Sequence, residues 1–119
     1  MLNINKLNFQ CTYFYGENVF QVSYREDQVS STKPEQLIRK VVEDYTSPRE
    51  AWRVLRQVQL PDGGYQIESQ DTSKGAPFYS RVRLYVRGTR VYYVTALTQD
   101  LSGPNKNDVT RFFDSFRFL

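Results

Sequence analysis

The chain has 119 residues, the length of one domain with its own hydrophobic core, and we expect a single domain over 1–119. Its 16 cationic and 13 acidic side chains give a formal net charge of +3, and its 15% aromatic residues favour a sheet-rich fold. The sequence holds no histidine and one cysteine, which excludes histidine-dependent catalytic triads, internal disulfides and cysteine-rich zinc sites.

An opening β-hairpin is predicted at the start of the chain. Apolar and polar residues alternate on both sides of the turn Gly16-Glu17-Asn18, as they do in half-buried strands. The apolar positions are Leu7, Phe9, Cys11, Tyr13 and Tyr15 before the turn, and Phe20, Val22 and Tyr24 after it. Because Cys11 shares a strand face with aromatic residues, we expect it to be a buried structural thiol rather than a nucleophile.

A helix is predicted after the polar connection 25–31. The pattern Thr32-Lys33-Pro34-Glu35 is typical of a helix start, with proline at the first helical position and glutamate at the third. Pro48 ends the helix, because the residue before a proline avoids the α region. Between these signals, helical spacing relates the apolar residues Leu37, Ile38, Val41, Val42 and Tyr45.

Two strands are predicted next, at about 53–60 and 65–70, joined by the strong turn Pro61-Asp62-Gly63-Gly64. Trp52 precedes the first of them, and we expect its ring to anchor the core at the junction between helix and strand. A loop at 71–77 follows the second strand.

Segment 78–97 predicts a second hairpin with two chemically different faces. Gly88-Thr89 is typical of a two-residue type II′ turn, which sets the register so that Arg87 faces Arg90 and Tyr85 faces Tyr92. One face is apolar and is expected to be core, with Phe78, Val82, Leu84 and Val86 against Val91, Tyr93, Thr95 and Leu97. The other, which we call the Arg/Tyr face, carries Tyr79, Arg81, Arg83, Tyr85, Arg87, Arg90 and Tyr92. Since unpaired arginines are not buried, this face is expected to meet water, a helix with acidic groups, or a partner.

The chain ends in a predicted polar loop, 101–107, and a short amphipathic helix at 108–116. In that helix Val109, Phe112, Phe113 and Phe116 recur at helical spacing. The order of two strands, a helix, four strands and a helix, with mostly hairpin-length connections, predicts an α+β fold. We expect an antiparallel sheet of about five to six strands, packed with one long helix and this short C-terminal one.

Two stretches of the sequence resemble a known family. Gly88-Thr89-Arg90-Val91-Tyr92-Tyr93, followed by Arg111-Phe112-Phe113-Asp114-Ser115-Phe116-Arg117, is similar to the C-terminal signature of uncharacterised bacterial domains related to the PsbP-like fold. Phe20-Gln21-Val22-Ser23-Tyr24 and the helix from Pro34 resemble the inner strand and the first helix of that family. The resemblance covers most of the chain and implies the PsbP-like fold; its motifs are packing motifs and imply no specific activity.

No motif in the sequence indicates catalysis. Carboxylate pairs such as Asp108 and Asp114 lack the spacing of a metal-binding loop, and solvated surface charge explains them. We therefore expect a non-enzymatic protein without cofactor or metal. No apolar run reaches the roughly 18 residues of a membrane helix. The start of the chain carries no export signal, so the cytoplasm is the default expectation.

The Arg/Tyr face is the candidate interaction surface. Five cations and no acid lie between Thr72 and Gln99, and this distribution favours an anionic partner. We expect binding of a protein partner through 78–97, because Tyr and Arg anchor protein interfaces. The alternatives are single-stranded nucleic acid stacked on the tyrosines, and a small-ligand pocket or histidine-independent hydrolase closed by 71–77. A further alternative is structural, with arginine stems lying over the tyrosine rings. The oligomeric state stays open.

Overall fold

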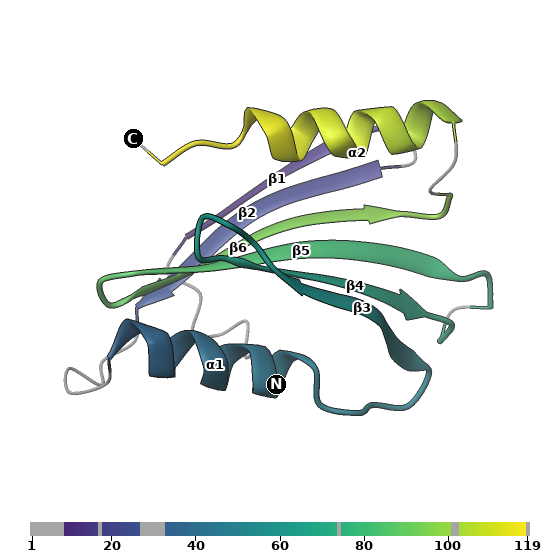
Figure 1. The fold of residues 1–119 in the computed structure, drawn as a ribbon. Coiled ribbons are helices and arrows are strands. Elements are labelled where there is room, and N and C mark those ends of the chain that lie inside the picture. The colour runs from purple at the N-terminus through teal and green to yellow at the C-terminus, as the bar shows by residue number, and fades with distance from the viewer. Residues whose placement is uncertain (1–8, 17, 27–32, 74, 101–102, 119) are drawn as a thin grey trace.

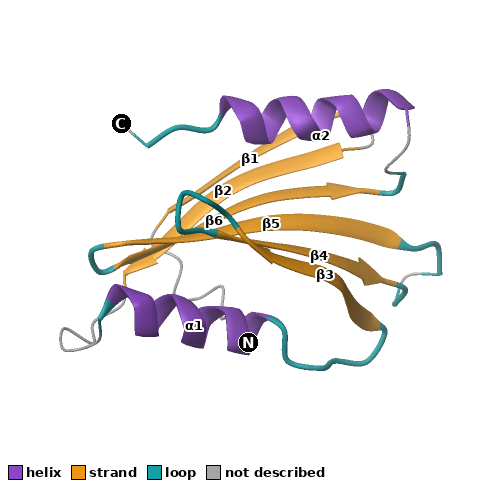
Figure 2. Cartoon of the chain, in the orientation of Figure 1, coloured by secondary structure: helices purple, strands orange, loops and turns teal. Residues whose placement is uncertain are grey.

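The computed structural model describes residues 9–16, 18–26, 33–73, 75–100 and 103–118. These residues form a six-stranded antiparallel sheet with a helix on each face (Figure 1, Figure 2). In chain order the elements are β1 (Phe9–Tyr15), β2 (Asn18–Glu26), α1 (Pro34–Tyr45), β3 (Trp52–Gln59), β4 (Tyr65–Asp71), β5 (Phe78–Arg87), β6 (Arg90–Thr98) and α2 (Gly103–Ser115). The predicted α+β class and the antiparallel sheet are confirmed.

The sheet brings the two predicted hairpins side by side. Its strand order is β1-β2-β6-β5-β4-β3, with every neighbouring pair antiparallel. Pairing of β2 with β6 places Val22 opposite Val94, across 72 positions of sequence. The β5–β6 hairpin therefore lies inside the sheet, and β1 and β3 form its edges.

The hydrophobic core under α1 occupies one face of the sheet. The helix contributes Leu37, Ile38, Val41 and Val42, and the sheet contributes Ile67, Val82, Leu84, Val91 and Tyr93. Each such side chain stabilises the fold by roughly 1.5–3 kcal/mol on full burial. Trp52 is half-buried beside this core, with its ring edge-on to Tyr45 at a centroid distance of 5.9 Å.

A second core lies on the opposite face, under α2. Val109 and Phe113 of α2 pack with Phe20, Tyr85, Val94 and Ala96 of the sheet. Figure 1 shows α2 above the sheet and α1 below it. The sheet is thus the middle of three layers, and both of its faces contain buried side chains.

The register predicted for the β5–β6 hairpin is confirmed. Arg87 pairs with Arg90, Tyr85 with Tyr92, and Arg83 lies opposite Val94. Gly88 has a φ of 60°, which a residue without Cβ adopts freely at the first position of a type II′ turn.

The helix boundaries differ from the prediction. α2 begins at Gly103, so 103–107, predicted as loop, is helical, and α2 with 13 residues is not shorter than α1 with 12. Pro104 falls in the first turn, where the missing N–H breaks no helical hydrogen bond. The N-cap of α1 is Lys33 without a side-chain cap, which makes Glu35 the second helical residue rather than the third. Thr32 lies outside the described residues.

Two side chains predicted to be buried are exposed. Cys11 is exposed because β1 is an edge strand that neither helix covers, so alternation along it does not lead to burial. Leu97 is exposed near the end of β6, on the α1 face, because the core under α1 does not extend that far along the strand. Leu7 lies outside the described residues.

Candidate functional site

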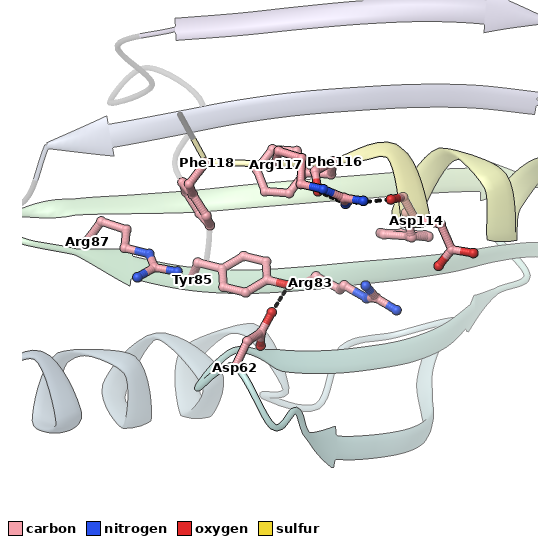
Figure 3. A pocket seen from close by; sticks show the side chains of 9 residues that line it. Asp62, Arg83, Tyr85, Arg87, Asp114, Phe116, Arg117 and Phe118 are labelled. Atoms are coloured by element: carbon pink, nitrogen blue, oxygen red, sulfur yellow. Dashed lines mark hydrogen bonds between the residues drawn. The ribbon is translucent and has the colours of Figure 1, made fainter.

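A groove opens between the β5–β6 hairpin and the C-terminal end of α2 (Figure 3). Its volume is about 580 Å³. The turn between β3 and β4, strand β5, and the end of α2 with the residues after it supply its walls. We call it the basic groove, and its lining residues are Asp62, Arg83, Tyr85, Arg87, Phe113, Asp114, Phe116, Arg117 and Phe118.

Tyr85 is held at the floor of the basic groove. Its side chain is only 5% exposed, and its hydroxyl donates to Oδ2 of Asp62 at 3.0 Å, as Figure 3 shows. The backbone N–H of Gly64 donates to Oδ1 of the same carboxylate at 3.1 Å. Burial raises the pKa of Tyr85, and the adjacent Asp62 raises it further. The tyrosine is therefore a neutral, fixed donor.

Three arginines give the groove its positive charge. Arg83 donates from Nε to Oε1 of Gln66 at 2.9 Å, and Arg117 donates from Nη1 to the backbone carbonyl oxygens of Asp114 and Phe116. Neither these two arginines nor Arg87 has a carboxylate of the described residues within ion-pair distance. The carboxylates of Asp62 and Asp114 also line the groove, beyond ion-pair distance of these arginines, so the lining carries three positive and two negative side chains.

Aromatic rings support two of these guanidinium groups. Arg83 lies 4.9 Å from the centroid of the Phe113 ring, and Arg87 lies 4.4 Å from that of Phe118. Such cation–π contacts position a guanidinium without using up its hydrogen-bond donors. Donors on both groups remain available to a ligand.

Phe118 joins the rings at the base of the groove. It makes edge-on contacts with Tyr85 at 5.2 Å and with Tyr92 and Phe116 at 5.0 Å each. The groove therefore combines an aromatic floor with a cationic rim.

The structure places all seven predicted site residues on the α2 side of the sheet but does not leave them as one open surface. Tyr85 is buried, because α2 and the residues after it cover this part of the hairpin. A covering helix was one of the surroundings that the sequence left open for this face. Arg81 pairs with Glu68 at 3.3 Å. Tyr79 is half-buried on the same strand. Of the arginines on this face, Arg87 and Arg90 are exposed.

At the turn end of the β5–β6 hairpin, Arg90 belongs to a cluster that lies outside the lining of the basic groove. Arg90 pairs with Glu26, and its guanidinium lies 4.5 Å from the centroid of the Tyr24 ring. The hydrogen bond from Arg90 lowers the pKa of Glu26. Tyr92 is half-buried, and its ring contacts the rings of Tyr24 and Phe118. Tyr85 is buried and so presents no ring on which a base could stack.

Six of the nine lining residues were not among the predicted site residues. Phe113, Asp114 and Phe116 were identified as part of the C-terminal helix. Asp62 was identified as part of a turn, and Arg117 and Phe118 as an extended tail. The motif Asp62-Gly63-Gly64 was a usable signal, since an aspartate in a turn often accepts from a backbone N–H two residues on. Its contact with Tyr85 depends on the pairing of β4 with β5, which no local pattern specifies.

Two further features, a metal-binding cluster and a membrane-spanning helix, were sought in the described part of the chain. Its residues include no group of three His, Cys, Asp or Glu side chains arranged to hold a metal ion. Among the same residues, no helix is long and apolar enough to cross a membrane.

The fold and the groove define an α+β domain with an antiparallel sheet between two helices and a basic groove on one face. Protein-family models give no match, and neither do curated proteins. A crystal structure of PA94 from Pseudomonas aeruginosa, described as a protein of unknown function and a candidate regulator, is similar to this chain with a TM-score of 0.66. The match covers 93% of this chain and 82% of that one at 12% identity, and so shows a shared fold alone.

Proposed function

We propose that this chain is a non-enzymatic binding domain, related to the PsbP-like bacterial domains, that binds an acidic segment of a protein partner in the basic groove. The observation that carries the proposal is the charge of the groove. Arg83, Arg87 and Arg117 line it without a carboxylate in ion-pair distance among the described residues, and they outnumber the two lining carboxylates, Asp62 and Asp114. Carboxylates of a partner would form charge-assisted hydrogen bonds with them, about twice as strong as neutral ones.

The aromatic floor favours a protein partner over a simple anion. Phe116 and Phe118 line the groove beside the arginines, so apolar and charged contacts are offered together. Aromatic residues and arginine are enriched in protein interfaces. A segment with carboxylates next to apolar side chains matches this lining.

Packing contacts support the PsbP-like part of the proposal. The residues that carry the resemblance are those that join α2 to the sheet: Phe113 is buried in the core under α2, and Phe112 and Phe116 pack against that core. Phe20 and Val22 of the inner strand meet the same cluster.

Arg87→Glu tests the protein-binding function. Arg87 is exposed and contacts Phe118, so the variant is expected to fold while reversing one charge of the groove. We expect a protein captured by the wild-type domain from cell extract to be lost with Arg87→Glu. Arg56→Glu, at an exposed arginine on β3, is the matched control and should keep that protein. Equal capture by both variants, or capture of no protein by the wild type, would overturn the proposal.

A small carboxylate ligand is the second candidate, and the volume of the groove favours it. Ligand sites span roughly 300–1,000 Å³, and this groove holds about 580 Å³. Thermal unfolding with millimolar phenylacetate or benzoate tests the idea. A rise in Tm that Arg87→Ala removes and Arg56→Ala keeps would support it, and an unchanged Tm would exclude these ligands.

A further inference from the structure

Strand β1 exposes aromatic side chains on both of its faces. Phe9 is 49% exposed, Tyr13 61% and Phe14 72%. Phe9 and Tyr13 lie on the α2 side, because the register pairs them with Tyr24 and Phe20, and Phe14 lies on the α1 side. Among the residues of β1 whose side chains are described, 9–14, none belongs to either hydrophobic core.

The two edges of the sheet differ in how they are protected. β3 carries the exposed Arg53 and Arg56, and its pairing with β4 is interrupted by a bulge between Val54 and Arg56. Charges and bulges of this kind prevent an edge from pairing with another strand. β1, Phe-Gln-Cys-Thr-Tyr-Phe-Tyr, has no charge, proline or glycine, and pairs with β2 in an unbroken register. Of the two edges of the described sheet, β1 is the one without such protection.

The exposed area of β1 suits a weak but specific association. The exposed parts of Phe9 and Tyr13 on the α2 side and of Phe14 on the α1 side together amount to roughly 300–450 Å² per chain. With the main chain of the strands, two copies joined at this edge would bury roughly 1,000 Å² in total, the lower limit for a specific interface. Interfaces at this lower limit are typical of weak associations, so dimerisation is expected at high protein concentration.

We propose that β1 pairs antiparallel with β1 of a second copy of this chain, which joins the two sheets into one across a two-fold axis. Antiparallel pairing of identical strands is self-complementary, since the same groups meet on both sides of the axis. Because β1 is uncharged, no like charges come to face each other across the new pair. The main-chain groups on its outer side gain the partners that the described sheet does not supply. This inference does not depend on the basic groove.

Sedimentation equilibrium over roughly 1–500 μM tests the pairing by measuring mass. We expect the wild type to approach twice the 14.0 kDa mass of one chain at the upper end. Phe14→Lys, at an exposed position, is expected to fold, as far-UV circular dichroism will verify, and to weaken the association at least tenfold. Leu55→Lys, on the opposite edge, is the matched control and should dimerise like the wild type.

Crosslinking at Cys11 tests the geometry of the pair. It is the one cysteine of the chain and is exposed, and pairing centred on Cys11 or Thr12 brings the two thiols within about 10 Å. A short bismaleimide should therefore give a crosslinked dimer in the wild type and Leu55→Lys, and not in Phe14→Lys. A monomer at every concentration, or a dimer that Leu55→Lys disrupts and Phe14→Lys does not, would overturn the inference.

Discussion

At the scale of single residues, Tyr85 connects the groove to the core. Arginines flank it two positions away on either side, yet its ring lies in the core under α2 while its hydroxyl reaches Asp62. A buried tyrosine with one polar end satisfied combines apolar burial with a hydrogen bond. It fixes the turn between β3 and β4 relative to β5.

The raised pKa of Tyr85 predicts that the protein loses stability in alkaline solution. Burial and Asp62 raise its pKa above the ordinary value of about 10, so the folded protein holds this proton more tightly than the unfolded chain does. The associated stability is fully present below about pH 10 and is lost as the pH rises through the folded pKa. We expect the free energy of unfolding, from urea titrations between about pH 8 and 11, to fall more steeply in the wild type than in Tyr85→Phe.

Tyr45 serves as the comparison, since burial raises its pKa as well and it remains in both proteins. Equal slopes in the wild type and Tyr85→Phe would mean that Tyr85 ionises alike in the folded and unfolded states.

At the scale of elements, the β3–β4 turn packs directly against β5. A Cβ placed on Gly64 would lie 2.5 Å from Cε1 of Tyr85, closer than real Cβ contacts allow. The φ of Gly64 is not in the left-handed region, so contact and not backbone conformation requires glycine here. Because the β3–β4 turn packs in this position, Asp62 lies at the basic groove.

Gly64→Ala is therefore expected to destabilise the fold by displacing the Tyr85 ring. Overpacking of this kind costs roughly 1–3 kcal/mol, which urea unfolding will measure. In a Tyr85→Leu background the same change should cost clearly less, because the ring atoms that clash are gone. A cost that is the same in both backgrounds would show that the Tyr85 contact is not what demands glycine.

At the scale of the whole molecule, one sheet carries two cores. Strands β5 and β6 contribute alternate side chains to the core under α1 and to the core under α2, with Leu84 and Tyr85 as adjacent examples. Loss of packing on one face must disturb the same backbone that supports the other face. The described domain is expected to unfold as one cooperative unit.

Phe113→Ala tests this cooperativity, because Phe113 belongs to the core under α2 while Trp52 lies beside the core under α1. The variant is expected to lose roughly 3–5 kcal/mol. The urea concentration at the midpoint of unfolding should be lower than in the wild type. It should be the same whether unfolding is followed by Trp52 fluorescence or by far-UV circular dichroism. Separate midpoints would indicate that the two faces unfold independently, and Leu55→Ala, at an exposed residue, should leave both unchanged.

Much of the fold was predictable because its signals are local. Gly88-Thr89 and the alternation around it specify the register of the β5–β6 hairpin, and the helical spacing from Leu37 to Tyr45 specifies the buried side of α1. The start of α2 was missed because polar residues at 103–107 resemble a loop when their place in a helix is unknown.

The candidate site was predictable only in part. The seven residues of the Arg/Tyr face do share one side of the sheet, as alternation requires. The contacts that turn Arg83, Tyr85 and Arg87 into the wall of a groove come from Asp62 and from the end of α2. These partners lie more than 20 positions away in the chain, beyond the reach of any periodic pattern.

Local patterns of side-chain type are thus enough to specify the strands, the helices, the hairpin turns and the two faces of segment 78–97, because these depend on neighbours a few residues apart. The side of the sheet that α2 covers, the burial of Tyr85 and the exposure of Cys11 follow from long-range packing. Edge strand β1 shows the reason most clearly. It alternates as β2 does, but its described side chains join neither core, so Phe9 and Tyr13 are exposed where Phe20 of β2 is buried.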